Sequence, residues 1–104
     1  MKQTPAQTLL RIHLKELGIE TIAEYQFYAE RKWRFDLASV GSRLAFECNG
    51  HFNGRHGVGW SADAEKLNTA QMLGWRCLVF SNKDVLTGRA KHWLAEWLGR
   101  EGGR

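Results

Sequence analysis

The sequence predicts a mixed α/β fold of the α+β type: a helix, a three-stranded antiparallel meander, a crossover helix, a fourth strand and a C-terminal helix. Two observations predict it. Apolar residues of helical period follow capping signals, and strand-like segments are separated by turn residues. A length of 104 residues, 43% of them hydrophobic, predicts a single domain, residues 1–104, with a buried core.

The first helix is predicted from a strong start signal. Thr4 can cap the helix, Pro5 suits the first helical position, and Gln7 is placed to complete a capping box. Gly18 is the expected stop. The apolar face consists of Leu10, Leu14 and Leu17.

A meander of three strands should follow. Residues 24–30 and 33–40 alternate apolar and polar side chains, and residues 43–49 form a further strand-like run. Gly41-Ser42 lies between the last two, and glycine at the first central position predicts a two-residue type II′ turn.

Such a hairpin fixes the register, because facing residues have numbers with a constant sum. Asp36 then faces Glu47 directly across the ladder. The other predicted pairs on that face are Arg34–Asn49 and Ala38–Ala45, and the apolar face pairs Phe35–Cys48, Leu37–Phe46 and Ser39–Leu44.

The second half reads as loop, helix, strand and helix. Residues 50–60 are rich in glycine and predict a loop, after which Ser61 is the expected cap of a helix through Leu73. The apolar run 75–80 predicts a strand buried on both faces. Ser81 should begin one continuous helix whose stripe is Val85, Leu86, Ala90, Trp93, Leu94, Trp97 and Leu98, with residues 100–104 as a frayed tail.

Composition excludes few classes of function. A net charge of +4 is compatible with nucleic acid or an acidic membrane surface, but names neither by itself. No apolar run approaches a membrane span, so a soluble cytoplasmic protein is expected. Cys48 and Cys77 have neither the number nor the spacing of a disulfide scaffold or zinc site, so no zinc is expected.

The opposed carboxylates of Asp36 and Glu47 are the sharpest feature. Like charges facing each other across a ladder destabilise a sheet by up to about 1 kcal/mol. A divalent cation such as Mg²⁺ would convert this repulsion into a binding site. Alternatively, the register is shifted by one residue, or Arg34 and Arg43 neutralise the pair on a solvated face.

These residues carry a resemblance to a known family. The string RFDLASVGSRLAFECNG, followed by GHFNGRHGVGW and by DAEKLNTAQMLGWRCLVF, resembles the active-site region of the PD-(D/E)xK nuclease superfamily. It is similar to the small phage and bacterial branch related to very-short-patch-repair endonucleases, and it covers residues 24–80. The resemblance implies a restriction-endonuclease-like core and a cytoplasmic role in a bacterial or phage-infected cell.

The resemblance also implies a metal site. Asp36 and Glu47 would bind Mg²⁺, which Mn²⁺ can replace, with help from the backbone carbonyl of Cys48. Glu24 would be an additional carboxylate. The usual lysine of the E-x-K motif is Asn49 here, which puts the activity in doubt unless another group supplies the charge.

Lys66 is the candidate to supply it, because some members of the superfamily take this lysine from the neighbouring helix. The alternative is a surface pair with Asp63. His56 is the candidate general base or phosphate ligand, assisted by His51 and Arg55. The alternative is that the histidines only cap backbone carbonyls in an ordered turn.

The expected function is a Mg²⁺-dependent DNA endonuclease. The alternative is a catalytically inactive module of the same fold that binds DNA or a protein. A small-molecule or structural module would require that the basic loop have no affinity for nucleic acid. A His-Asn-His nuclease is less favoured, because His51, Asn53 and His56 are too close together for that motif. Trp93 and Trp97 are expected in the core or in a homodimer contact through the C-terminal helix. The expected DNA contacts are Arg31, Lys32, Arg34, Arg55, His51 and Asn49, with Trp33 packing or stacking on a base.

Overall fold

The computed structural model describes the backbone of residues 3–48 and 58–102, and the side chains of residues 3–48 and 64–100. Three helices and four strands follow one another in the predicted order, and one additional short helix, α3, brings the described helices to four. The elements are α1 (Pro5–Glu16), β1 (Ile22–Gln26), β2 (Arg34–Ser39), β3 (Leu44–Cys48), α2 (Val58–Met72), β4 (Arg76–Phe80), α3 (Asn82–Leu86) and α4 (Arg89–Gly102).

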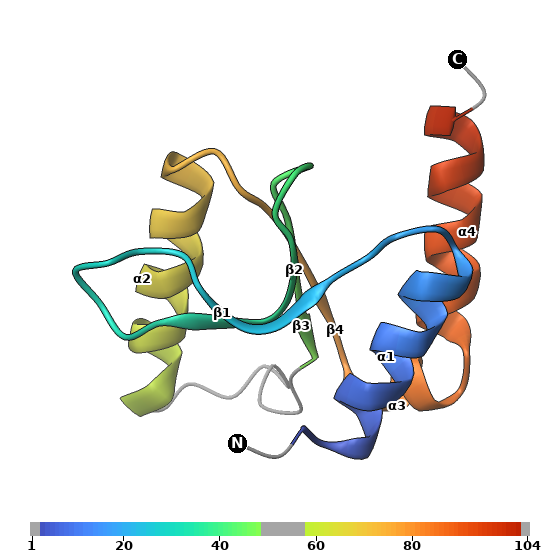
Figure 1. The fold of residues 1–104 in the computed structure, drawn as a ribbon. Helices are drawn as coiled ribbons and strands as arrows, with labels where there is room; N and C mark the ends of the chain where they lie inside the picture. Colours follow the sequence, from blue (N-terminus) through green and yellow to red (C-terminus); the bar gives the residue numbers. More distant parts are fainter. Residues whose placement is uncertain (1–2, 49–57, 103–104) are drawn as a thin grey trace.

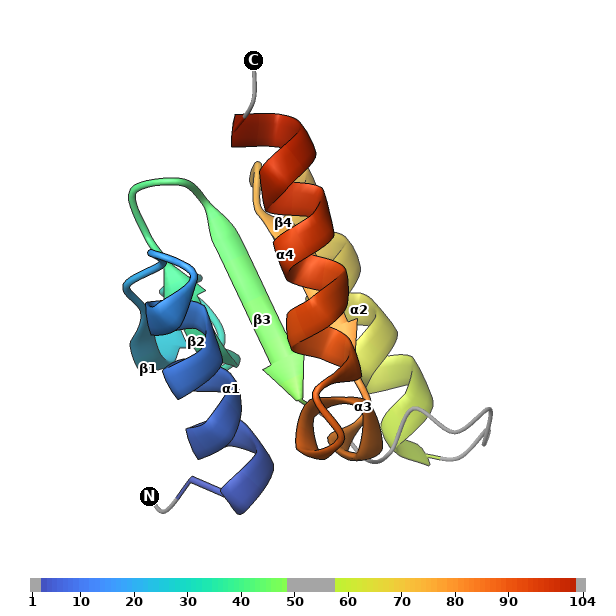
Figure 2. The ribbon, with the colours of Figure 1, turned by 90° about the vertical axis from the view of Figure 1, so that its right-hand side faces the viewer.

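The sheet has the strand order β1-β2-β3-β4. The first three strands form the predicted antiparallel meander, and β4 pairs parallel to β3 after the α2 crossover. Helix α2 covers one face of the sheet, while α1, α3 and α4 lie on the other (Figures 1 and 2). The predicted fold class is therefore confirmed.

Each face of the sheet has its own apolar core. The larger core joins β2 and β3 to α1, α3 and α4, and the smaller one joins the same strands to α2 and to Trp75, which directly precedes β4. The larger core contains Ala6, Leu10, Leu14, Leu37, Phe46, Cys48, Val85, Ala90 and Leu94, and the smaller contains Phe35, Ala38, Ala45, Ala70 and Trp75.

The predicted β2–β3 register is confirmed for the pairs Leu37–Phe46, Ala38–Ala45 and Ser39–Leu44. The predicted type II′ turn is wrong. The positive φ of the connection lies at Arg43 (φ 56°) and not at Gly41. The connection spans four residues, 40–43, and this longer loop preserves the same pairing as the two-residue turn.

The strict alternation predicted for β2 is also wrong at one point. Phe35 and Leu37 should share a face, yet Phe35 packs in the smaller core and Leu37 in the larger one. Phe35 stacks on Phe27 with ring centroids 4.1 Å apart, and its ring also meets Trp75 at 5.0 Å. Packing between aromatic rings therefore turns Phe35 toward α2, and it does not share a face with Cys48 as predicted.

The bounds of β1 and of α2 differ from the prediction. β1 ends at Gln26, because Phe27 and Tyr28 leave the strand direction and stack against Trp33. Helix α2 begins at Val58, three residues before the predicted cap Ser61. The predicted helix start at Thr4 is confirmed, with both hydrogen bonds of the capping box present.

The C-terminal part contains two helices and not one. Ser81 caps α3 as predicted, but Gly88 has φ +84° and separates α3 from α4. The predicted frayed tail is helical as far as Gly102. β4 is an edge strand, so the prediction that it is buried on both faces is wrong: Val79 is exposed. Within the described residues, no helix is long and apolar enough to cross a membrane.

Candidate active site

Two carboxylates meet where the β2–β3 ladder ends. Its last paired residues are Leu37 and Phe46, and the positions beyond them are joined through side chains. The Asp36 amide donates to Glu47 Oε2 at 2.7 Å, and the Cys48 amide donates to Asp36 Oδ2 at 2.8 Å. The carboxylates therefore replace backbone acceptors, which fixes their position without a metal.

Lys66 reaches this pair from α2. Its Nζ lies 2.6 Å from Glu47 Oε1. The Lys66 side chain is 16% exposed and the Glu47 side chain 8%. The ammonium also lies 6.0 Å from the centroid of the Phe35 ring. The structure thus brings Lys66 to the carboxylates, as expected for a lysine supplied by the neighbouring helix. The alternative partner, Asp63, has a side chain outside the described residues.

Burial dominates the electrostatics of Glu47, which is only 6% exposed. Removal from water raises the pKa of Glu47. Lys66 opposes this rise, Asp36 adds to it, and the net direction is upward. A buried carboxylate of this kind gains from any cation that comes to it, because the cation offsets the missing hydration.

The donor set suits a hard divalent cation. Mg²⁺ is commonly held by one or two carboxylates together with waters and substrate phosphates, and Asp36 and Glu47 supply two. Asp36 Oδ1 receives no hydrogen bond from a described residue. Across the described side chains no group of three His, Cys, Asp or Glu residues is gathered around one point. A metal here would need further ligands besides these two carboxylates.

Glu24 lies beside this pair in the sheet. Its position falls between the pairs Ala23–Leu37 and Tyr25–Phe35, and so opposite Asp36. Glu24 has φ 54°, a conformation that costs a non-glycine residue about 1–3 kcal/mol. The strained residue of β1 therefore adjoins the place where side-chain alternation in β2 is interrupted.

The structure describes only some of the predicted DNA contacts. Arg31 donates to both carboxylate oxygens of Glu65, at 3.2 and 3.4 Å, and its guanidinium lies 4.0 Å from the centroid of the Trp33 ring. The Arg31–Glu65 ion pair joins the β1–β2 connection to α2, and no local sequence pattern indicates a pair so distant along the chain. Lys32 and Arg34 are exposed and form no ion pair within the described residues. Four further candidates, Asn49, His51, Arg55 and His56, lie outside the described residues.

Both thiols are poor nucleophiles. Burial is the main cause that raises the pKa of Cys48, and likewise that of Cys77, to about 11. The Cys48 thiol donates to Asn82 Oδ1 at 3.1 Å and so ties β3 to the start of α3. The structure gives these thiols a packing role, in agreement with the sequence interpretation of Cys48 as an apolar filler.

The carboxylates of Asp36 and Glu47 and the ammonium of Lys66 thus meet beside a β-hairpin, on a mixed sheet with helices on both faces (Figure 1). Among solved structures, the chain is similar to the catalytic domain of the homing endonuclease I-Bth0305I. The TM-score is 0.71 at 18% identity, over 92% of this chain and 95% of that one. No protein-family model and no curated protein matches the sequence. The likeness establishes the fold, while the narrower resemblance to very-short-patch-repair endonucleases stays a prediction.

Proposed function

We propose that this protein is a Mg²⁺-dependent DNA endonuclease that hydrolyses phosphodiester bonds. The observation that carries the proposal is the ion pair of Lys66 with Glu47, beside Asp36. Two carboxylates and one lysine are the three groups that the D…E-x-K motif assembles. Asn49 occupies the motif's lysine position, and Lys66 of α2 would supply the lysine instead. The endonuclease-like fold supports the same function.

In this proposal Asp36 and Glu47 hold the metal, with the Cys48 carbonyl as a further oxygen ligand. When bound, Mg²⁺ supplies positive charge that polarises a phosphate and acidifies a water molecule. The amides of Asp36 and Cys48 hold the two carboxylates in place before the metal arrives. This preorganisation removes the cost of ordering flexible side chains at the moment of binding.

Lys66 has a separate role. Its ammonium carries three donors, of which Glu47 occupies one, so others remain for the oxygens of a phosphodiester. A fixed positive charge in a partly buried site stabilises the negative charge that develops on phosphorus-bound oxygen during hydrolysis. Glu24 is proposed as an additional carboxylate that acts through water.

DNA is the proposed substrate. Arg31, Lys32 and Arg34 would contact its phosphates, since cations on and beside one connection suit a polyanionic backbone. The candidates Asn49, His51, Arg55 and His56 complete the proposed contact set, with His56 as general base or phosphate ligand.

A catalytically inactive module that binds DNA or a protein is the second candidate. One observation favours it: Glu47 is already satisfied on both oxygens, by Lys66 and by the Asp36 amide. A site closed in this way can persist without any metal. DNA binding by the inactive module would be indifferent to Mg²⁺ and to the Asp36→Asn substitution.

The test combines cleavage with metal binding. Purified protein is incubated with single-stranded, duplex, branched and mismatched DNA in the presence of Mg²⁺, Mn²⁺ or EDTA, and calorimetry measures Mn²⁺ binding directly. Asp36→Asn should abolish cleavage and weaken Mn²⁺ binding at least tenfold while leaving the circular dichroism spectrum unchanged. Lys66→Met should reduce cleavage more than a hundredfold but retain Mn²⁺ binding.

Lys91→Met is the matched control, because Lys91 forms an equally short but exposed pair with Glu16. It should leave cleavage unchanged. The proposal fails if none of these DNA substrates is cut and no Mn²⁺ binds. Metal-independent DNA binding that survives Asp36→Asn would instead support the inactive module.

A further inference from the structure

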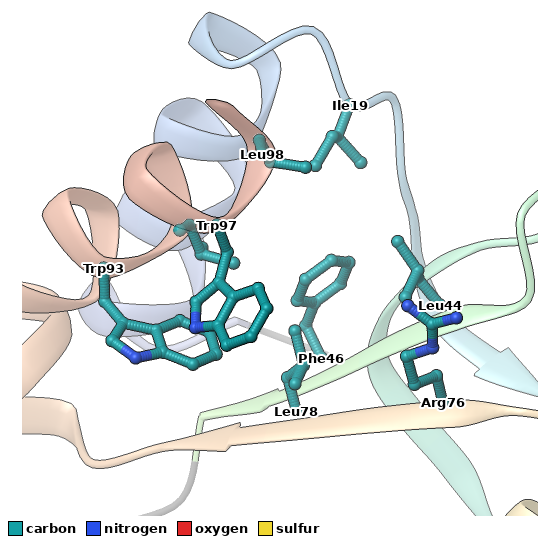
Figure 3. Close-up of a pocket in the computed structure, with 9 residues that line it drawn as sticks. Ile19, Leu44, Phe46, Arg76, Leu78, Trp93, Trp97 and Leu98 are labelled. Carbon is teal, nitrogen blue, oxygen red and sulfur yellow. The ribbon is translucent and has the colours of Figure 1, made fainter. Parts of the chain in front are cut away.

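An apolar groove of about 280 Å³ lies between α4 and strands β3 and β4 of the sheet (Figure 3). Trp93 and Trp97 of α4 lie along one side of it, while Phe46 of β3 and Leu78 of β4 lie on the other. Each tryptophan is 42% exposed. Large aromatic side chains left half exposed around a concavity are typical of a binding surface.

The tryptophan side of the groove is held in shape before any partner arrives. Phe80 packs edge-on against Trp93 with ring centroids 6.0 Å apart, and Trp93 meets Trp97 at 5.8 Å. The Arg100 guanidinium lies 5.4 Å from the centroid of the Trp97 ring. A partner therefore meets ordered aromatic rings, which lowers the entropy lost on binding.

The groove is separate from the candidate active site. Phe46 lines the groove, whereas its neighbour Glu47 bonds to Lys66 of α2 on the opposite face of the sheet. Substitutions in the tryptophans can therefore be tested without touching the carboxylates. The inference does not depend on the proposed nuclease function.

The charges around the groove indicate what would occupy it. Arg76 is the one charged side chain among the groove residues of the described chain. Arg76 and Arg100 form no ion pair within the described residues, unlike Lys91, which is paired with Glu16. A second copy of the chain would bring the same arginines to the contact, whereas a partner bearing carboxylates would neutralise them.

We propose that this groove binds an amphipathic segment of a partner protein, in which one or two bulky apolar side chains are flanked by carboxylates. The apolar side chains would fill the space between Trp97 and Phe46, and the carboxylates would pair with Arg76 and Arg100. Bulky anchors in a desolvated pocket with a charged rim are the usual arrangement at binding hot spots.

Two designed helical peptides test the proposal. Both carry the same Leu and Trp face, and the flanking residues are Glu in one and Lys in the other. Calorimetry at low salt should give a Kd for the Glu peptide at least tenfold lower than for the Lys peptide. Arg76→Glu with Arg100→Glu should reverse that preference. Trp97→Ala should weaken binding of the Glu peptide at least tenfold.

Leu86→Ala is the matched control, because Leu86 is an exposed apolar residue outside the groove. It should leave the Kd unchanged, and thermal melting checks that every variant is folded. The proposal is overturned if neither peptide binds, or if both bind equally and the arginine substitutions change nothing. It is also overturned if sedimentation shows a dimer that Trp97→Ala converts to monomer, because a second copy would then fill the groove.

Discussion

Replacing Lys66 with methionine tests the central feature of the site. Methionine keeps a similar length and apolar stem but removes the ammonium that lies 2.6 Å from Glu47. The carboxylate of Glu47 then stays buried without its ion partner. We expect Lys66→Met to lower the free energy of unfolding at pH 8 by about 3–5 kcal/mol, the usual cost of breaking a buried ion pair.

The magnitude can be judged against a matched surface pair. Lys91 and Glu16 lie 2.7 Å apart, but their side chains are 39% and 53% exposed. Solvent screens such a pair, so Lys91→Met should cost only about 0–1 kcal/mol. A difference of roughly 3 kcal/mol between the variants is large for a domain whose total stability is of the order of 5–15 kcal/mol.

The effect should also depend on pH. Lys66 lowers the pKa of Glu47, so its removal lets the folded-state pKa rise further above the ordinary value of 4.5. Folded Lys66→Met then holds a proton that the unfolded chain releases. Its stability deficit should be smallest near pH 4.5 and should grow as the pH rises through the raised pKa.

Urea unfolding followed by tryptophan fluorescence, at pH 5 and pH 8, measures both quantities. The reasoning is refuted if Lys66→Met and Lys91→Met lose equal stability at pH 8. If Lys66→Met loses the same free energy of unfolding at pH 5 and at pH 8, only the electrostatic explanation is refuted. A loss of packing alone would not depend on pH.

Three further outcomes follow from local structure. Thr4→Ala should lower unfolding free energy by about 1 kcal/mol in urea titrations, since it removes the capping hydrogen bond of α1, whereas Thr4→Ser should not. Gly88→Ala should cost about 1–2 kcal/mol in the same assay, because φ is +84° there; a neutral result would contradict the positive φ. Iodoacetamide should alkylate Cys77 about a hundredfold more slowly at pH 8 than an ordinary thiol, because the pKa of Cys77 is raised to about 11. Mass spectrometry after timed quenching measures the rate, and rapid labelling of Cys77 would contradict the raised pKa.

The register of β2 with β3 could be predicted from the sequence because it depends on short-range constraints. The pairing of β2 with β3 survives a wrong turn type, since a four-residue connection preserves the same partners as a two-residue one. Lys66 follows instead from the resemblance to the nuclease superfamily, because some of its members take the lysine that Asn49 replaces here from the neighbouring helix. Local pattern therefore suffices where the chain has few alternatives.

Other features depend on contacts distant in sequence. Phe35 turns toward α2 because its ring packs against Phe27 and Trp75. The alternation of apolar and polar residues along β2 does not predict these contacts. The exposure of Val79 depends on β4 lying at the sheet edge, which the apolar run itself cannot indicate. The apolar stripe continues across Gly88 and in the sequence outweighs the stop signal of that glycine, whose positive φ separates α3 from α4.

The Glu47–Lys66 pair is better explained by function than by stability. Replacement of a buried ion pair by neutral side chains of similar size is often neutral or stabilising by about 1–4 kcal/mol, because no charge has to leave water. Glu47→Gln combined with Lys66→Met keeps an oxygen able to accept from the Asp36 amide. We expect this double variant to be at least as stable as the native chain in urea, and more stable than Lys66→Met alone at pH 8. A double variant less stable than Lys66→Met would mean that the ion pair itself holds the fold together, and the functional explanation of its burial would be lost.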